Sequence, residues 1–243
     1  MKQNKYDDPG FFTNYSQMPR SRLGLDGAGE WMAFRAMFPE LRGKRVLDLG
    51  CGFGWHCRYV REQQASSAVG VDLSANMLER ARQMTDDPQI QYLQAAIEDI
   101  GFAEKEFDLV ISSLALHYIE DFEEICGKVY RYLADGGSFV LSVEHPVFTS
   151  VAAQDWHYSP EGQKLHWPLD DYHEEGPRVA KFLDHDVVKY HRTMATLVNA
   201  LIQTGFRIRE LSELKPPQDK RNDPEWEEAN RRPIFLLIAA DKE

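Results

Sequence analysis

Short apolar runs alternate with stretches of helical spacing from residue 45 to residue 144. The runs, rich in β-branched residues, are RVLDLG, AVGVDLS, IQYLQA, FDLVISS and SFVLSVE. Between them, residues 55–64, 74–85 and 122–133 have the spacing of helices, with Ser74 as an N-cap and Gly136 or Gly137 as a C-cap of the third. Strands that alternate with helices are typical of a parallel sheet covered on both faces. The pattern therefore predicts an α/β fold.

The alternation stops after His145 for about forty residues. Connections longer than ~12–15 residues without regular structure are uncommon and usually functional, so we interpret this stretch as an insertion. Within it, RVAKFL and DVVKYH flank a turn at Asp184 and His185 and predict a small hairpin, although a helix remains open for the second run. Regularity returns with the amphipathic TMATLVNALIQTGF, closed by Gly205, and with two strands, RIRELSEL and IFLLIAAD.

Composition and charge narrow the class of protein. A chain of 243 residues with a net charge of −11 fits one large domain and argues against a broad phosphate-binding surface. Its three cysteines are too few for a disulfide framework, and no metal-ligand spacing is present, so we expect no metal. The apolar runs fall short of the ~18 residues that span a bilayer, and no signal-type segment opens the chain. We expect a cytoplasmic protein without membrane contact.

The stretch RVLDLGCGFGWHC places three glycines on alternate positions directly after the first strand: Gly50, Gly52 and Gly54. Glycines there let a ligand approach the backbone N–H groups at the start of a helix. A pyrophosphate-binding Gly-x-Gly-x-x-Gly would need glycine where Trp55 stands, which disfavours a dinucleotide. Asp72, about twenty positions on and at the end of the second strand, is placed to accept both hydroxyls of a ribose.

Four motifs in this order resemble the class I S-adenosylmethionine-dependent methyltransferases, in the group that includes small-molecule and quinone-precursor enzymes: VLDLGCGFG, GVDLSANMLERAR, FDLVISSLALHYIED and LADGGSFVLSV. The resemblance implies a doubly wound, three-layer fold with seven strands in the order 3-2-1-4-5-7-6, only strand seven being antiparallel. It implies one domain, residues 1–243: a cofactor-covering segment (1–44), a cofactor-binding core (45–145), an inserted substrate lid (146–192), and a last helix and two strands (193–243).

The same resemblance implies the residues that bind S-adenosylmethionine. By position they are Tyr15, Arg20, Leu49, Gly50, Cys51, Gly52, Asp72, Leu73, Met77, Ile97, Glu98, Ser113 and Leu114. The glycine loop would line the methionine part, Tyr15 and Arg20 would meet its carboxylate, and Ser113 and Leu114 would lie beneath the sulfonium. Many relatives carry an acidic residue where Ala96 stands, so the backbone of Ile97, with Glu98, is expected to contact adenine instead.

Two histidines at the carboxyl edge of the sheet are candidate catalytic residues, His145 and His117. Methyl transfer mainly requires two reactants to be aligned and water to be excluded, and a base matters only if the acceptor carries a proton. A packing role remains open for His117. His145 leads directly into the insertion, where we expect it to face the acceptor.

The insertion is rich in aromatic rings, which can cover a planar substrate. The expected substrate-binding residues are Trp156, Trp167, Tyr172 and His191. The alternative is that these rings form a satellite core beneath a long loop.

Three functions therefore remain. The first is methylation of a small, aromatic or planar metabolite at oxygen, nitrogen or carbon. The second is methylation of a transfer-RNA nucleotide, with a basic patch of Lys215, Lys220, Arg221, Arg231 and Arg232, although the acidic chain makes a nucleic-acid partner the weaker expectation. The third is a non-catalytic sensor or partner subunit that binds the cofactor. The oligomeric state stays open.

Overall fold

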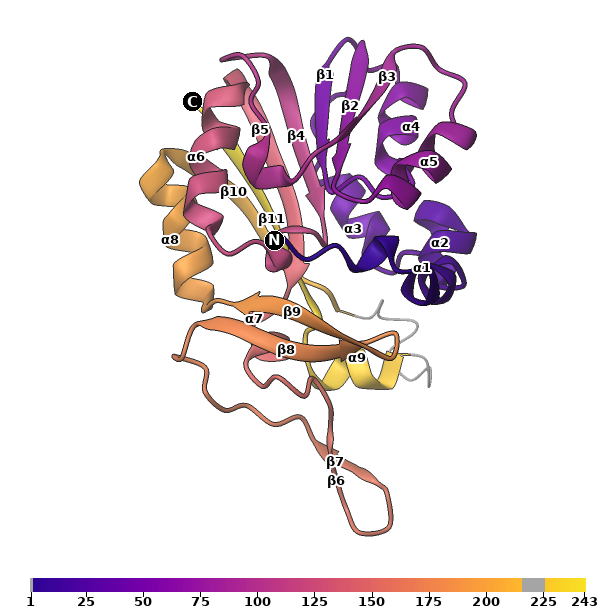
Figure 1. Ribbon diagram of the computed structural model, residues 1–243. Coiled ribbons are helices and arrows are strands. Elements are labelled where there is room, and N and C mark those ends of the chain that lie inside the picture. Colours follow the sequence, from indigo (N-terminus) through magenta and orange to yellow (C-terminus); the bar gives the residue numbers. More distant parts are fainter. Residues whose placement is uncertain (1, 216–225) are drawn as a thin grey trace.

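A seven-stranded sheet forms the centre of the molecule (Figure 1). The computed structural model describes residues 2–215 and 226–243. Across the sheet the strands are β10 (Phe206–Glu213), β11 (Phe235–Lys242), β5 (Leu133–Glu144), β4 (Phe107–Ser113), β1 (Arg45–Leu49), β2 (Ser67–Asp72) and β3 (Ile90–Gln94). Only β11 runs antiparallel to its neighbours in this sheet. Counted in chain order, the seven strands have the predicted order 3-2-1-4-5-7-6.

Helices cover both faces of the sheet, because the side chains of each strand alternate between two apolar clusters. One cluster joins Leu47 and Val110 to α6 (Phe122–Tyr132) and α8 (Met194–Thr204). The other joins Val46 and Leu109 to helices of the opposite layer, α3 (Trp31–Ala36), α4 (Trp55–Glu62) and α5 (Ala75–Gln83). The three-layer arrangement is therefore confirmed.

The helix ends agree with the sequence pattern except at one place. Ser74 accepts a hydrogen bond from the Met77 N–H at the start of α5, and Gly205 closes α8 with a φ of 108°. The prediction that Gly136 or Gly137 caps α6 is wrong. That helix ends at Leu133, which is extended and already begins β5, and Gly136, with a φ of 75°, lies within this strand.

The N-terminal segment lies beside the carboxyl ends of β1 and β2 (Figure 1). It consists of the 3₁₀ turn Lys5–Asp7, α1 (Pro9–Ser16), α2 (Pro19–Arg22) and the 3₁₀ turn Gly24–Gly27. Asp7 fixes it to the start of α5, because its carboxylate accepts hydrogen bonds from the Ser74 hydroxyl (2.5 Å) and the Asn76 N–H (3.1 Å).

The insertion after β5 contains α7 (Pro146–Thr149) and two separate hairpins. The strands β8 (Gly176–Phe182) and β9 (His185–His191) form the predicted hairpin, so the helical alternative is wrong. Its turn is Leu183–Asp184, both with positive φ, one residue earlier than expected. The second hairpin, β6 (His157–Tyr158) with β7 (Lys164–His166), projects away from the sheet (Figure 1). A short α9 (Glu227–Arg231) precedes β11.

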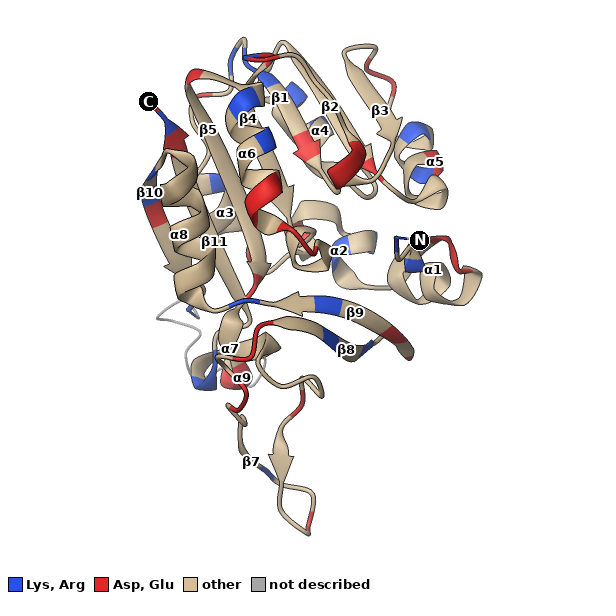
Figure 2. Cartoon of the chain, turned by 60° about the vertical axis from the view of Figure 1, so that its left-hand side comes forward, with Lys and Arg blue, Asp and Glu red and all other residues tan. Residues whose placement is uncertain are grey.

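Charges of both signs are mixed along the chain rather than separated. Figure 2 shows Lys and Arg close to Asp and Glu on the helices and on the β8–β9 hairpin. Among the described residues, none of the helices has the length and apolar character needed to cross a bilayer.

Candidate active site

A cavity of about 630 Å³ lies at the carboxyl ends of the parallel strands. Asp72, Ser113 and Glu144, which end β2, β4 and β5, all line it, and the N-terminal segment and β9 form its outer wall. Most of the predicted site residues come together here: Tyr15, Arg20, Gly50, Gly52, Asp72, Leu73, Met77, Ile97, Glu98, Ser113, Leu114 and His117. The edge of the sheet that open α/β folds use for ligands is therefore hollow in this protein.

The glycine loop leaves its backbone open to the cavity. Gly52 has a φ of 51°, and a Cβ added there would meet no atom of the described residues within 4 Å. At Gly50, with a φ of 77°, a Cβ would lie 2.4 Å from the Cβ of Ala115. Both positive φ values favour glycine. At Gly50 a side chain would also collide with Ala115, and at Gly52 it would extend into the open space of the cavity. That space suits a ligand lying against the main chain.

Asp72 is held in a fixed orientation beside this loop. One carboxylate oxygen accepts the Gly52 N–H and the other accepts the Ser74 N–H, both at 2.9 Å. Burial raises the pKa of Asp72, and these two N–H donors oppose that effect. Its remaining lone pairs are available to hydroxyl groups in the cavity.

A smaller hollow of about 70 Å³ continues from the main cavity. Tyr15, Gly50 and Ser113 line both spaces, so the two are joined. Here the Arg20 guanidinium donates to both carboxylate oxygens of Glu30, at 2.9 and 3.0 Å. Two further lining residues have buried polar atoms without a hydrogen-bond partner in the described structure, the Ser21 hydroxyl and the Trp55 indole N–H. Unsatisfied donors next to a paired charge suit the ionic end of an amino acid.

Two of the residues predicted to bind the cofactor, Leu49 and Cys51, are not among the described residues that line the main cavity. Leu49 is fully buried, and its carbonyl accepts from the Ser112 hydroxyl at 3.0 Å. Cys51 lines the smaller hollow. At the other end, the backbone carbonyl of Glu98 accepts a hydrogen bond from the Lys128 ammonium. The Glu98 carboxylate lies 3.7 Å from the Lys2 ammonium.

The far end of the main cavity holds His117 and Glu144. The Nδ1 atom of His117 accepts from the Glu144 N–H at 3.4 Å, and burial lowers the pKa of this histidine to about 4, so the ring is neutral at neutral pH. Glu144 contacts the Lys189 ammonium at 2.6 Å and the Gln154 amide at 2.8 Å. Burial alone would raise the pKa of Glu144, but the adjacent His117 and the ion pair with Lys189 together hold it below its usual value.

The structure does not bring His145 into the cavity wall formed by the described residues. Its Nδ1 atom accepts the Val147 N–H at 3.0 Å and so caps α7, and its Nε2 atom lies 2.9 Å from Glu213. Burial lowers its pKa. The expectation that it faces the acceptor therefore has no support from its placement, because both ring nitrogens already have partners. The sequence signal for the cap was Pro146 directly after it.

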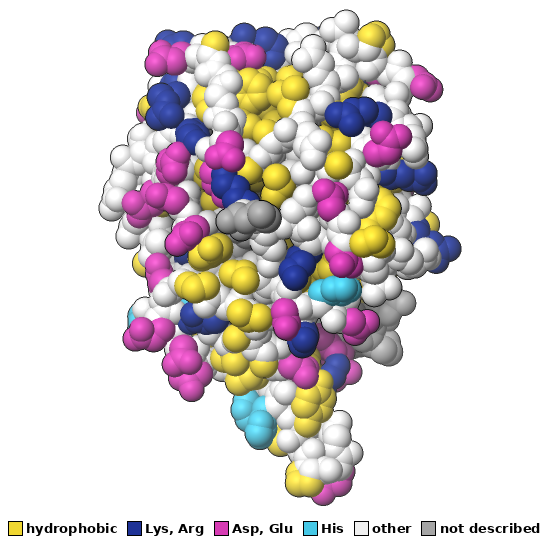
Figure 3. Space-filling view, viewed as in Figure 1, with side chains coloured by type: hydrophobic (Ala, Val, Ile, Leu, Met, Phe, Trp, Pro, Cys, Tyr) yellow, Lys and Arg dark blue, Asp and Glu magenta, His cyan; other side chains and the backbone are white. Residues whose placement is uncertain are grey.

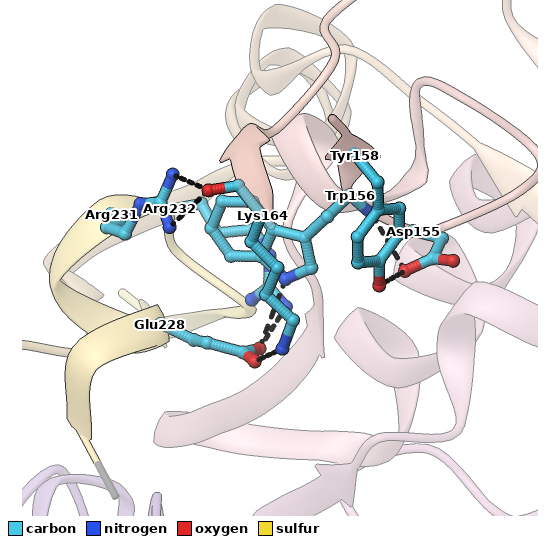
Figure 4. Close-up of polar contacts among 7 residues, drawn as sticks. All are labelled: Asp155, Trp156, Tyr158, Lys164, Glu228, Arg231 and Arg232. Carbon is cyan, nitrogen blue, oxygen red and sulfur yellow. Dashed lines mark hydrogen bonds and ion pairs between the residues drawn. The ribbon is translucent and has the colours of Figure 1, made fainter. Parts of the chain in front are cut away.

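Trp156 and Trp167 form a separate cluster next to the β6–β7 hairpin, with ring centroids 5.5 Å apart. Figure 4 shows Trp156 with Glu228, Arg231 and Arg232. The Arg232 guanidinium lies 4.1 Å from the Trp167 ring centroid and 5.1 Å from that of Trp156, and Arg231 lies 4.2 Å from Trp156. Glu228 accepts from the Trp156 indole N–H at 3.3 Å. In the described structure neither tryptophan lines the cavity, which matches the satellite-core alternative rather than a substrate contact.

Tyr172 and His191 fix the insertion to the start of α8. His191 contacts the Thr149 hydroxyl at 2.7 Å and the Tyr172 carbonyl at 3.0 Å, and the Tyr172 hydroxyl accepts the Met194 N–H at 3.0 Å. Neither belongs to the described lining of the cavity. These two residues therefore hold the β8–β9 hairpin in place instead of facing a ligand.

Sequence reasoning missed several lining residues, namely Tyr6, Tyr118, Glu144, Phe182, Val187 and Tyr190. Glu144 could have been found, because it ends a parallel strand at the ligand edge. Tyr6, Phe182 and Tyr190 reach the cavity through the packing of distant segments, for which the sequence carries no local signal.

The described residues test only part of the expected basic patch. Arg231 and Arg232 stack on the tryptophan cluster, whereas Lys220 and Arg221 lie outside the described residues. On the face shown in Figure 3, Lys and Arg side chains are interspersed with Asp and Glu. That face does not have the continuous positive surface typical of nucleic-acid binding.

Comparison with known proteins agrees with the site. A family model described as a methyltransferase domain matches residues 47–141. The structure of a Listeria monocytogenes protein assigned to the S-adenosylmethionine-dependent methyltransferases has a TM-score of 0.86 and 48% identity, covering 90% of this chain and 99% of that one. An S-adenosylmethionine-dependent methyltransferase from Mesorhizobium loti has a TM-score of 0.84 and 46% identity, covering 90% of this chain and 100% of that one.

A Haemophilus influenzae protein of uncharacterised function is 31% identical over 248 residues, covering 99% of this chain and 98% of its own length. Relatives that share almost half of their residues over nearly their full length have the same fold, and the open glycine loop beside Asp72 is what an adenosyl ligand needs. The chain therefore belongs to the class I S-adenosylmethionine-dependent methyltransferases.

Proposed function

We propose that this enzyme methylates a small molecule with a planar or apolar body, at a nitrogen or oxygen atom that is not part of a carboxylate. The observation that carries the proposal is the extent of the cavity, which continues beyond Ser113 and Leu114 to His117 and Glu144. Its outer part has apolar walls formed by Ile119, Phe182 and Val187, together with the polar His117 and Glu144. Such a mixture suits a small organic acceptor.

The residues on the inner side fit S-adenosylmethionine, which supplies a methyl group bound to a positively charged sulfur. Gly50 and Gly52 would hold it against the main chain, Asp72 would accept from its ribose hydroxyls, and Leu73 and Met77 would pack on its adenine. The smaller hollow, with its unpartnered donors and the Arg20–Glu30 pair, would take the amino-acid end.

The outer wall of the cavity supports water exclusion. The Gln3 carboxamide donates to the Val188 carbonyl at 3.3 Å and accepts the Val188 N–H at 2.7 Å, which joins the N-terminal segment to β9. Phe11 and Phe182 make an edge-to-face contact with ring centroids 5.8 Å apart. Alignment of two reactants away from water is the main protein contribution to a displacement reaction.

Charge in the cavity disfavours a carboxylate acceptor. The charged residues that line it, in the described part of the chain, are the acids Asp72, Glu98, Glu120 and Glu144 and the bases Lys2, Lys5 and Arg20. Lys2 and Arg20 are already paired, with Asp99 at 2.6 Å and Glu30 at 2.9 Å. Glu144 is also paired, with Lys189 at 2.6 Å. Neither Lys2 nor Arg20 is therefore free to balance an additional carboxylate, whereas a neutral or basic acceptor needs no such partner.

His117 is the residue we assign to acceptor contact. Because its Nδ1 atom accepts the Glu144 N–H, the neutral ring carries its proton on Nε2 and can donate a hydrogen bond to the acceptor. In this role it orients the acceptor rather than removing a proton from it.

The test is transfer of an isotopically labelled methyl group from S-adenosylmethionine into fractionated cell extract. The expected result is label in small molecules that survives mild alkali, together with formation of S-adenosylhomocysteine. Methyl esters of carboxylates release methanol under mild alkali, so alkali-labile label would contradict the proposal. Label in RNA would favour the alternative of transfer-RNA methylation.

A further inference from the structure

Three tyrosines from separate segments line the cavity. Tyr6 comes from the first 3₁₀ turn, Tyr15 from α1, and Tyr118 from the 3₁₀ turn Leu116–Tyr118, and all three line the cavity. The rings of Tyr6 and Tyr15 meet edge to face, with centroids 5.1 Å apart. Tyr6 and Tyr118 lie close enough that each affects the pKa of the other.

The position of this group relates it to the reacting atoms. Tyr15 lies where the main cavity joins the smaller hollow, since it lines both, as Gly50 and Ser113 do. In S-adenosylmethionine the sulfur atom connects the nucleoside to the amino-acid part, so a cofactor that fills both spaces has its sulfur at this junction. Tyr118, which is near Glu144, then lies on the acceptor side of the methyl group, and Tyr6 is next to both Tyr15 and Tyr118.

Aromatic rings around a small space favour a cation, because the ring faces are electronegative. The charges nearby do not oppose this, because they are balanced: Glu144, near Tyr118, is paired with Lys189 at 2.6 Å, and the Arg20 cation is neutralised by the buried Glu30. Burial raises the pKa of each tyrosine, so the hydroxyls are neutral and add no competing charge. The group has the composition of an aromatic cage next to a carboxylate.

Charge balance then separates the classes of acceptor. An ammonium substrate first loses a proton to water, which frees the nitrogen lone pair. That lone pair then forms the new N–C bond, and the C–S bond breaks with its electron pair remaining on sulfur. The positive charge moves from sulfur to nitrogen, and a proton leaves the product for water if nitrogen still carries one. With a phenolate or carboxylate the charge is lost, so the product leaves nothing for a cation site to bind.

We propose that Tyr6, Tyr15 and Tyr118 form a cation-binding cage for the nitrogen of the acceptor, so that the substrate is an amine and the product a methylated ammonium. This inference rests on the proposed function, since it specifies the acceptor of the same site.

The first experiment compares two ligands of equal shape by calorimetry on the full chain saturated with S-adenosylhomocysteine. Choline carries a trimethylammonium group, and 3,3-dimethyl-1-butanol carries a neutral tert-butyl group in its place. We expect choline to bind about tenfold more tightly. Equal affinities would overturn the proposal.

Variants show whether the rings are responsible. Tyr118→Phe keeps the ring and should bind choline within about threefold of the wild type, whereas Tyr118→Leu and Tyr6→Leu should each lose about tenfold. The control is Tyr158→Leu, at an exposed tyrosine of β6, which should change nothing. If Tyr118→Leu weakens the affinity for 3,3-dimethyl-1-butanol as much as the affinity for choline, the ring acts through packing and the cage is contradicted.

A last measurement separates the acceptor from the cofactor, because the sulfonium is also a cation. If Tyr118→Leu weakens S-adenosylmethionine but neither S-adenosylhomocysteine nor choline, the rings serve the sulfonium and the amine proposal is wrong. If the enzyme methylates a phenol and binds choline and its neutral isostere equally, the proposed amine acceptor is wrong, while the proposed methyltransferase function stands. Absence of any S-adenosylhomocysteine formation would refute the proposed function itself.

Discussion

The two ends of the cavity are built in different ways. At the cofactor end, the shape comes from the main chain: Gly50 and Gly52 adopt positive φ values, and Asp72 is fixed by two backbone N–H groups. At the acceptor end, the shape comes from side chains that separate segments bring together, such as Tyr6 from the N-terminal segment and Phe182 from β8. The first end is therefore a local property of one strand–turn–helix unit, whereas the second depends on how the whole chain packs.

The insertion shows the same division on a smaller scale. Its β8–β9 hairpin lies over the cavity, where Phe182, Val187 and Tyr190 form part of the wall. Its β6–β7 hairpin projects outward and is held by the tryptophan and arginine cluster (Figures 1 and 4). One inserted segment thus supplies both a wall of the site and a satellite core, and mutations in the two parts should have opposite consequences.

The largest effect is expected from Trp156→Ala. Removing this buried ring from the arginine and tryptophan cluster should lower the free energy of unfolding by about 3 kcal/mol and leave the KM for the acceptor unchanged. Phe182→Ala should do the reverse, raising the KM with a smaller loss of stability, because the ring is partly exposed at the cavity. Thermal unfolding and steady-state kinetics measure the two effects. A raised acceptor KM in Trp156→Ala would break the division of the insertion.

The next effect tests the cofactor end with two matched glycines. Gly52→Ala and Gly43→Ala place a Cβ at similar positive φ values, 51° and 73°, and neither Cβ meets a described atom within 4 Å. Both should lose about 1–2 kcal/mol of stability through backbone strain. Gly52→Ala should in addition weaken S-adenosylmethionine by about 1–3 kcal/mol, which is roughly 5- to 150-fold, because the methyl group enters the space of the ligand.

Calorimetric titration of both variants with S-adenosylhomocysteine decides the outcome. Equal affinities in Gly52→Ala and Gly43→Ala would show that the loop does not lie against the cofactor.

These two regions also explain what the sequence could predict. The α/β sheet follows from the alternation of strands and helices, and the open backbone at Gly50 and Gly52 beside Asp72 follows from their spacing. The strand order and most cofactor-side residues could be predicted only because four motifs resemble a known family. The acceptor side could not be predicted in the same way. Trp156 and Trp167 are aromatic and lie in the insertion, but composition does not reveal which surface a ring meets. Tyr6 stands in a polar segment and reaches the cavity only because Asp7 caps α5.

A smaller effect on the acceptor KM should follow from breaking the contact between Gln3 at the N-terminus and Val188 of β9. Gln3→Ala removes both hydrogen bonds to Val188, each worth about 0.5–1.5 kcal/mol before solvent exposure reduces it. We expect the acceptor KM to rise about threefold to tenfold while affinity for S-adenosylhomocysteine is unchanged. The exposed Gln83, which bonds to Glu79 on α5, provides the control Gln83→Ala. An unchanged KM in Gln3→Ala would indicate that the wall does not depend on this contact.

The smallest effect is expected at His145, where the two candidate histidines can be compared. His145→Ala removes the cap of α7 and should cost about 1 kcal/mol of stability at pH 7.5, with the KM and kcat unchanged. Because burial lowers the pKa of His145 in the folded protein, the unfolded chain binds its proton more readily. Stability should therefore rise with pH through the interval between the lowered pKa and the usual value near 6.5, and this contribution should be absent below that interval. The variant should lose this part of the pH dependence.

His117→Asn should instead lower kcat/KM, because His117 lines the cavity and its neutral ring can donate to the acceptor. Denaturant unfolding at pH 5.5 and 7.5, with kinetics at pH 7.5, separates the two. A kinetic defect in His145→Ala equal to that of His117→Asn would place both histidines at the acceptor and remove the contrast between a residue that shapes the fold and one that meets the substrate.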